Sequence, residues 1–269
     1  MTDSLLELGH VAKRFGQVVI AEDLSLTVSA GDVTGIVGPN GAGKTSLFGL
    51  ISGDLAPDAG EIRFGGHPVN KLDAAARCRL GIGRTYQVPR PFGDMTVFEN
   101  LLVAAQQGGG LRRRASYAAA VEAMERTGIS GQANVSAERL GLLQRKRLEL
   151  ARALATQPTL LLLDEVAGGL TDPEVAQLVE IVRGVNAEGI AVIWIEHVVR
   201  ALTAVVSRLI CLAGGTFVGD GEPATVLAQP EVREVFLGTT VTAALASGSL
   251  EPPPAVPRDA VADGERSDP

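Results

Sequence analysis

The eight residues GPNGAGKT at positions 38–45 are the most informative part of this sequence. They fit the pattern of a glycine, any four residues, Gly-Lys and then Ser or Thr. The apolar run at residues 33–37 predicts a buried strand before them, and residues 45–51 predict a helix after them. A simple glycine-rich surface turn is the alternative. The flanking strand and helix favour a nucleotide phosphate site, because backbone N–H groups and a helix N-terminus can point at an anion.

Two side chains of this loop have expected roles. Lys44 is expected to reach the β and γ phosphates of a bound nucleotide, and the Thr45 hydroxyl to ligate Mg²⁺. The glycines are expected to let the backbone wrap closely around phosphate. The nucleotide-binding residues predicted from this stretch are Gly38, Pro39, Asn40, Gly41, Ala42, Gly43, Lys44, Thr45 and Ser46.

A second group of reactive side chains follows an apolar run further along the chain. Residues 159–163 read TLLLL and predict a buried strand, which ends in Asp164 and Glu165. Two adjacent carboxylates there are costly without a cation, and a magnesium-bound nucleotide would supply one. We expect Asp164 to hold the metal and Glu165 to orient or deprotonate the attacking water. An acidic turn that only solvates the strand end is the alternative.

The pattern outward from these two motifs predicts an α/β fold. Strand-like runs alternate with helical patterns, which predicts a parallel sheet with crossover helices. Residues 97–155 have helical spacing, interrupted by the glycines at 108–110, and predict a helical subdomain. Residues 248–269 are rich in Pro, Ala, Asp and Ser and predict a disordered tail. Further strands are predicted at residues 24–28, 61–64, 190–195 and 209–212, and helices from about 173 and from 198.

The composition is that of a globular protein and argues against several classes of function. The 269 residues are 46% hydrophobic and 20% charged, with a net charge of −7. This charge argues against a nucleic-acid binder, because such proteins collect phosphates with a basic face. Cys78 and Cys211 lack zinc-site spacing, which favours a reduced, intracellular setting. The start has no signal-peptide pattern and no run of about 18 apolar residues predicts a membrane span, so a membrane role is expected to need a partner.

Four further stretches make the sequence resemble the ATP-binding subunits of ABC transporters over about residues 5–238. RTYQ at residues 84–87 resembles the Q-loop of that family, and GGLTDP at residues 168–173 resembles the loop that crosses to the other subunit of its dimer. IWIEH at residues 193–197 ends in a residue that matches the switch histidine. Phe15 lies where the family stacks an aromatic ring on adenine, with a strand-edge core phenylalanine as the alternative.

The resemblance implies a P-loop NTPase fold of the ABC type. This fold has a central, mostly parallel sheet with flanking helices, an N-terminal antiparallel β part and a helical subdomain. The ATP-binding domain would cover residues 1–247, with the helical subdomain inserted at about residues 90–155. His197 would contact the γ-phosphate, and Gln87 would sense Mg²⁺ and the water. The implied catalytic residues are Lys44, Gln87, Glu165 and His197, and the implied Mg²⁺ ligands are Thr45, Gln87 and Asp164.

Within the family, several phrases resemble importers of branched-chain amino acids and related small amides. They are residues 84–87, 95–100 (MTVFEN), 145–158 (RKRLELARALATQP) and 195–197 (IEH). This resemblance implies a subunit that binds and hydrolyses ATP to energise such an importer, for branched-chain amino acids or similar small polar solutes. It would work at the cytoplasmic face of the membrane. Its partners would be membrane permease subunits, a second ATP-binding subunit and, indirectly, a solute-binding protein.

In the family, a helix of the membrane subunit docks beside the Q-loop, and the resemblance implies that it would contact residues that include 88–98 of this chain. Phe92, Met95 and Phe98 would supply an apolar patch at that place. Ordinary packing inside the helical subdomain is the alternative role for the same three side chains.

The sequence departs from the family pattern at the signature segment, residues 140–144. Gly141 removes the hydroxyl that the family uses to cap the γ-phosphate of the opposite subunit, and Leu143 adds bulk where the backbone should approach phosphate. Losing one charge-assisted contact costs about 1.5–3 kcal/mol. Val166 also replaces a usual proline, and we expect an effect on loop rigidity. Where the family reads Leu-Ser-Gly-Gly-Gln, this chain has Leu140, Gly141, Leu142, Leu143 and Gln144.

An intact site of its own beside an altered signature favours a heterodimer. The ATP of this chain would be capped by the partner's signature, and the partner's ATP by the weaker segment of this chain. A soluble ABC-type ATPase that is not coupled to transport is one alternative, although such proteins usually carry a second ATPase unit or a long coiled coil. A nucleotide-binding regulatory subunit with weak hydrolysis is another, and the intact Glu165 and His197 speak against it.

Overall fold

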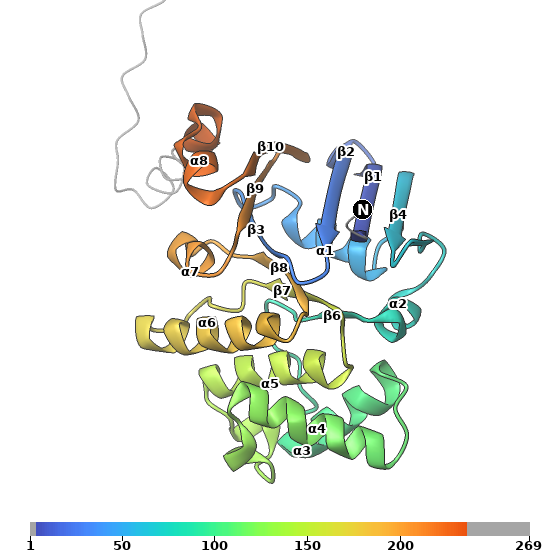
Figure 1. Ribbon diagram of the computed structural model, residues 1–269, viewed down its shortest axis with the longest axis vertical. Helices are drawn as coiled ribbons and strands as arrows, with labels where there is room; N and C mark the ends of the chain where they lie inside the picture. Colours follow the sequence, from blue (N-terminus) through green and yellow to red (C-terminus); the bar gives the residue numbers. More distant parts are fainter. Residues whose placement is uncertain (1–3, 236–269) are drawn as a thin grey trace, which may run out of the picture.

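The computed structural model describes residues 4–235, which form two β-sheets with helices packed around and below them (Figure 1). This arrangement confirms the predicted α/β class, with an antiparallel N-terminal sheet and a mostly parallel central sheet. The tail predicted at residues 248–269 lies outside the described residues.

The first sheet is antiparallel, and its strand order is β2-β1-β4-β5. Its apolar side chains alternate with more exposed ones, as Leu6 and Leu8 of β1 do, because one face packs on the core. The sequence predicted only parts of β2 and β4 and did not predict β1, where register shifts interrupt the alternation. The strands are β1 (Ser4–Phe15), β2 (Val18–Ser29), β4 (Ala59–Phe64) and β5 (His67–Pro68).

The second sheet has the order β10-β9-β3-β8-β7-β6, and every pairing except β10 with β9 is parallel. β3, β7 and β8 are buried along their whole length, which explains why they appear in the sequence as unbroken apolar runs. Parallel strands end at one edge, so the segments that follow β3, β7 and β8 come together. The strands are β3 (Val33–Val37), β6 (Ile82–Arg84), β7 (Leu160–Asp164), β8 (Ala191–Ile195), β9 (Arg208–Ala213) and β10 (Thr216–Gly221).

In the described chain, four helices, α2, α3, α6 and α8, begin at a side-chain cap. The hydroxyl of Thr96 and the carboxylate of Glu99 form a capping box before α3, and Thr171 with Glu174 form another before α6. The helices α3, α4 and α5 lie together at the end of the molecule away from the antiparallel sheet (Figure 1). The helices are α1 (Lys44–Ser52), α2 (Ala74–Leu80), α3 (Val97–Val103), α4 (Arg114–Thr127), α5 (Leu142–Ala155), α6 (Asp172–Ala187), α7 (Val199–Thr203) and α8 (Pro223–Ala228).

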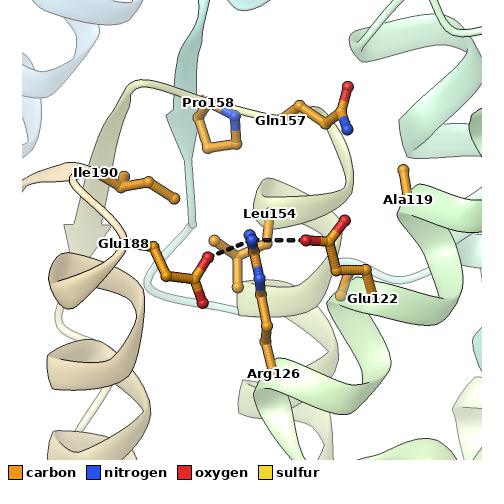
Figure 2. Close-up of a pocket in the computed structure, with 9 residues that line it drawn as sticks. Ala119, Glu122, Arg126, Leu154, Gln157, Pro158, Glu188 and Ile190 are labelled. Carbon is orange, nitrogen blue, oxygen red and sulfur yellow. Dashed lines mark hydrogen bonds and ion pairs between the residues drawn. The ribbon is translucent and has the colours of Figure 1, made fainter.

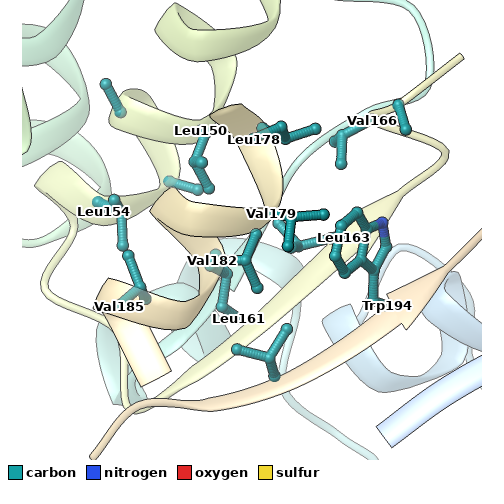
Figure 3. Close-up of a cluster of buried hydrophobic side chains, with 14 of the residues drawn as sticks. Leu150, Leu154, Leu161, Leu163, Val166, Leu178, Val179, Val182, Val185 and Trp194 are labelled. Carbon is teal, nitrogen blue, oxygen red and sulfur yellow. The ribbon is translucent and has the colours of Figure 1, made fainter. Parts of the chain in front are cut away.

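The leucine run of β7 supplies two hydrophobic cores, one on each face of the central sheet. Leu161 and Leu163 pack in the core that contains α5 and α6, and Figure 3 shows them near Trp194, Val179 and Val182. The intervening leucines of the same strand belong to the other core, which contains α1 and the antiparallel sheet. Alternate residues of a strand face opposite sides, so the single strand joins both cores.

An ion-pair group connects the helical end of the molecule to α6. Arg126 near the end of α4 pairs with Glu122 of the same helix at 2.7 Å and also with Glu188, which caps α6 (Figure 2). These side chains border a cavity of about 170 Å³ that Leu154 of α5 also lines. The guanidinium therefore ties α4 to the end of α6.

Candidate functional site

The phosphate loop runs from the end of β3 to the start of α1. Gly38 and Gly43 have φ angles of 155° and 100°. A Cβ atom at Gly38 would lie 2.0 Å from the carbonyl oxygen of Leu212 in β9, and one at Gly43 would lie 2.5 Å from that of Ile20 in β2. These two glycines are therefore required by the neighbouring strands, in addition to the close approach to phosphate that the sequence suggested.

The side chain of Lys44 folds over its own loop. The residue is 6% exposed, and its ammonium donates hydrogen bonds to the carbonyl oxygens of Gly38 at 2.8 Å and Pro39 at 3.0 Å. Burial lowers the pKa of Lys44, while the negative charges of Glu165 and Asp164 act in the opposite direction. A cavity of about 430 Å³ lies over this loop, lined by Ile20, Asn40, Gly41, Ala42, Gly43, Lys44, Thr45, Ser46, Gln87 and Glu165.

Asp164 is the last residue of β7 and is 1% exposed. Its Oδ2 accepts a hydrogen bond from Arg84 Nη2 at 3.4 Å, and its backbone N–H donates to the hydroxyl of Thr85 at 3.1 Å. Oδ1 is buried and has no hydrogen-bond partner among residues 4–235. Burial raises the pKa of Asp164, and the nearby Arg84 lowers it. A buried carboxylate oxygen without a protein partner fits a divalent cation, which is the role expected for this residue.

Glu165 leaves β7 with a φ of 46°, a conformation that is uncommon for residues other than glycine. Its side chain is 17% exposed, and Oε2 accepts a hydrogen bond from Gln87 Nε2 at 2.6 Å. His197 Nδ1 lies 3.9 Å from the same oxygen. These three residues follow β6, β7 and β8, so the structure brings together side chains that are far apart in the sequence.

His197 follows β8 and is exposed, with 58% of its side chain accessible. The preceding residue, Glu196, is fully buried, and its carboxylate accepts hydrogen bonds from the backbone N–H groups of Ala167 at 2.6 Å and His197 at 3.3 Å. Burial raises the pKa of Glu196, while the hydrogen bond from Ala167 lowers it. An exposed imidazole on an anchored backbone can contact a ligand from solvent.

The signature segment has the opposite character. Gly141 is the N-cap residue of α5, and as a glycine it has no side chain that could cap the helix. Leu142 is 47% exposed, and its Cδ2 would lie 3.2 Å from a Cβ atom at Gly169. Leu143 is half-buried. In residues 4–235, none of the five residues from Leu140 to Gln144 lines the cavity over the phosphate loop.

The adenine contact expected of Phe15 stays a prediction, and its exposed ring does not fit the alternative of a core phenylalanine. Phe15 ends β1 with 51% exposure, and its ring lies 5.3 Å from the ammonium of Lys13. Within residues 4–235, the cavity is lined by Ile20 and not by Phe15. The contact of Arg84 with Asp164 was not predicted from the sequence. The positive charge of Arg84, three residues before Gln87, was a signal that could have indicated it.

The arrangement suits a triphosphate and a divalent cation. The N-terminus of α1, the Lys44 ammonium and the exposed Thr45 surround the cavity from one side. Asp164 and Glu165 bring negative charge to the adjoining strand end. Cationic and N–H groups favour phosphate, and the carboxylates favour a metal or a water that must lose a proton.

Comparison with known proteins identifies the family. A family model described as "ABC transporter" matches residues 21–168, which is more than half of the chain. The chain belongs to the ABC transporter family. It is an ATP-binding cassette and an ATPase, and the resemblance recognised in the sequence is confirmed.

Two groups of relatives extend this result. The ATP-binding protein LivG of Salmonella typhimurium, named for high-affinity branched-chain amino acid transport, is 33% identical over 88% of this chain and 99% of its own length. BraF of Pseudomonas aeruginosa, with the same description, is 32% identical over the same shares. The lipopolysaccharide export ATP-binding protein LptB of Escherichia coli is 33% identical over 85% of this chain and 95% of its own.

Solved structures of the family have the same fold. A nucleotide-free ATP-binding cassette from an ABC transporter has a TM-score of 0.81 at 28% identity, over 87% of this cassette and 98% of that chain. The ADP conformation of MJ1267, another ABC cassette, has a TM-score of 0.80 at 29% identity, over 87% of this chain and 99% of that one. In residues 4–235 of this cassette, no helix has the length and apolar character that crossing a membrane requires.

Proposed function

We propose that this ABC ATPase energises an importer of branched-chain amino acids or similar small polar solutes at the cytoplasmic face of the membrane. The observation that carries the proposal is the similarity to LivG and BraF along 99% of their lengths. The phrases at residues 84–87, 95–100 and 145–158 support the same class. LptB is equally identical over a shorter alignment, so transport itself must decide the solute.

The proposed chemistry is phosphoryl transfer from ATP to water, which depends on positioning and charge stabilisation. Lys44 and His197 would hold the γ-phosphate. Glu165 would align the attacking water and accept its proton, and the hydrogen bond from Gln87 at 2.6 Å would fix the direction of that carboxylate. Bound Mg²⁺, held by Thr45, Gln87 and Asp164, would supply charge neutralisation at the phosphate oxygens.

The proposed assembly is a heterodimer of two ATP-binding subunits on membrane permease subunits. The partner's signature would cap the nucleotide over residues 38–45 of this chain, and residues 140–144 would face the partner's nucleotide. The ATP-binding domain would cover residues 1–247, with a helical subdomain at about residues 90–155. Exposure of Leu142 in the described chain supports a segment that awaits a partner.

The proposed contact with the permease lies on the surface after β6. Tyr86, Val88, Phe92 and Met95 are exposed there, and a cavity of about 420 Å³ opens beside Val88. Phe98 differs from the expectation for the apolar patch, because it is half-buried and packs on Tyr117 with ring centroids 5.4 Å apart. The proposed docking patch therefore excludes Phe98.

A transport assay tests the proposed solute class. The gene would be deleted in its native host and complemented with wild type or E165Q, and uptake of radiolabelled leucine would be measured beside that of an unrelated sugar. Deletion should abolish leucine uptake and spare the sugar, and only the wild-type copy should restore it. Normal leucine uptake in the deletion strain, or a defect in lipopolysaccharide export instead, would reject this solute class.

A further inference from the structure

Lys146 is a buried lysine that contacts the backbone of both Gln87 and Glu165. It lies in the first turns of α5, just after the signature segment at residues 140–144, and is only 4% exposed. Its ammonium donates to the backbone carbonyl oxygen of Gln87 at 3.1 Å and to that of Glu165 at 3.2 Å. One buried side chain thus contacts the two residues whose side chains form the hydrogen bond at the reaction centre.

The surroundings favour a cation at this point. The carboxylates of Glu196, Glu165 and Glu149 act on Lys146 electrostatically and oppose the cost of its burial. Glu196 is itself fully buried and holds the N–H of Ala167, in the loop that follows Glu165. A buried charge is retained only where hydrogen bonds and opposite charges compensate for its lost hydration. The buried ammonium of Lys146 therefore forms part of the contact between α5 and the loop that begins at Glu165.

The backbone of Glu165 needs such support. Its φ of 46° is unfavourable for a residue with a Cβ atom, and it persists only where neighbours fix it. Lys146 holds the carbonyl group of that residue, while the N–H of Glu165 donates to Ile195 at 2.9 Å. With Gln87 held by the same ammonium, the spacing between the Gln87 amide and the Glu165 carboxylate is fixed from the backbone side.

We propose that Lys146 is a positioning residue for ATP hydrolysis, which sets Glu165 and Gln87 from the signature helix. The inference rests on the proposed roles of these two residues. It also gives α5 a second task. The helix begins at the segment proposed to face the partner's nucleotide, and a rigid helix that shifts there moves Lys146 with it.

The test uses the full-length chain with three substitutions. K146M removes the ammonium at similar length, and K146R keeps a charged donor. R147M is the matched control, because Arg147 lies next to Lys146 on α5 but bonds to Gly128 at 3.2 Å and Gln177 at 2.6 Å, outside the site. Steady-state ATPase, equilibrium binding of Mg-ATP and amide hydrogen exchange of residues 85–88 and 165–168 are measured for each.

K146M should lose roughly tenfold or more in kcat, since small misplacement of catalytic groups has effects of this size. Its ATP affinity should stay within about twofold of wild type, because Lys146 is not among the described residues that line the cavity over the phosphate loop. Exchange in both segments should rise. K146R should retain most of the rate, and R147M should match wild type in kcat and in exchange.

The outcomes separate this inference from the proposed function. If K146M has the same kcat as R147M and unchanged amide hydrogen exchange, the proposed role of Lys146 is wrong. The conclusion that this chain hydrolyses ATP is not affected by that result. A wild-type chain that fails to bind Mg-ATP overturns the proposed site instead. If K146M does not fold, K146Q carries the same comparison with a neutral, shorter side chain. If the chain alone turns over too slowly, the hydrogen-exchange result decides.

Discussion

The surroundings of Glu165 and the segment at residues 140–144, proposed to face a partner, are constructed differently. Around Glu165, the side chains of Gln87 and Lys146 and the backbone at Ile195 supply hydrogen bonds from three other elements. In the signature segment, Leu142 is 47% exposed and Gly141 caps its helix without a side-chain bond in the described chain. The contacts of Glu165 are thus made within one subunit, whereas Leu142 leaves an apolar side chain exposed at the start of α5.

The two regions are expected to differ in how well they tolerate amino-acid substitutions. A side chain held by several bonds at the end of a buried strand cannot be altered without leaving polar groups unpaired. An exposed apolar residue at a helix start can be exchanged at little cost to the fold. The altered signature is therefore compatible with a stable subunit, and its consequences are expected in the partner's site.

The largest effect is expected for E165Q. Glutamine keeps an acceptor for the Gln87 amide but cannot take a proton, and loss of a general base lowers turnover by about 10²–10⁴-fold. In the proposed heterodimer, E165Q in this chain should nearly abolish hydrolysis, while the equivalent change in the second ATP-binding subunit should cost much less. Steady-state ATPase of the two mixed dimers measures this. Equal losses would remove the asymmetry.

A smaller effect is expected for G43A, in the chain's own phosphate loop. The added methyl group would meet the carbonyl oxygen of Ile20 at 2.5 Å in a left-handed conformation. Strain of this type costs about 1–3 kcal/mol. Weaker Mg-ATP binding and a lower free energy of unfolding should appear in calorimetry and urea denaturation. G31A is the control, because Gly31 is also left-handed but a methyl group there meets nothing within 4 Å. Equal effects of the two changes would attribute the loss to conformation alone.

Restoring the family signature should increase activity. The triple variant G141S/L142G/L143G returns the hydroxyl and the two small residues, and one regained charge-assisted contact of about 1.5 kcal/mol corresponds to roughly tenfold in rate. The gain should appear at the partner's site. It is measured in a dimer in which this chain also carries E165Q, so that only the partner's site hydrolyses ATP. No gain in that dimer would mean that the segment does not cap a nucleotide.

The smallest effect is expected for L142A. Its side chain is exposed in the described part of the chain, so the free energy of unfolding of the isolated subunit should change by less than about 0.5 kcal/mol. L163A, in the buried core of β7, should cost about 2–5 kcal/mol in the same urea titration. A large loss for L142A would show that this segment is part of the subunit's own core.

Much of this architecture was predictable, since the apolar runs of β3, β7 and β8 and the capping signals before α6 are local. β1 was harder because bulges break its alternation, and β6 is too short to leave a pattern. The motifs of the site were visible as residue types. Their contacts were not, because the bonds of Lys146 to Gln87 and Glu165 depend on elements that meet only in the folded chain.

The leucine strand that serves both faces of the central sheet has a consequence for how the enzyme fails. Leu162 and Leu163 belong to opposite cores, and Asp164 follows them directly. Weaker packing in either core would make β7 less well fixed, and β7 positions the carboxylates of Asp164 and Glu165. L162A and L163A, one in each core, should therefore both lower the ATPase rate along with the melting temperature.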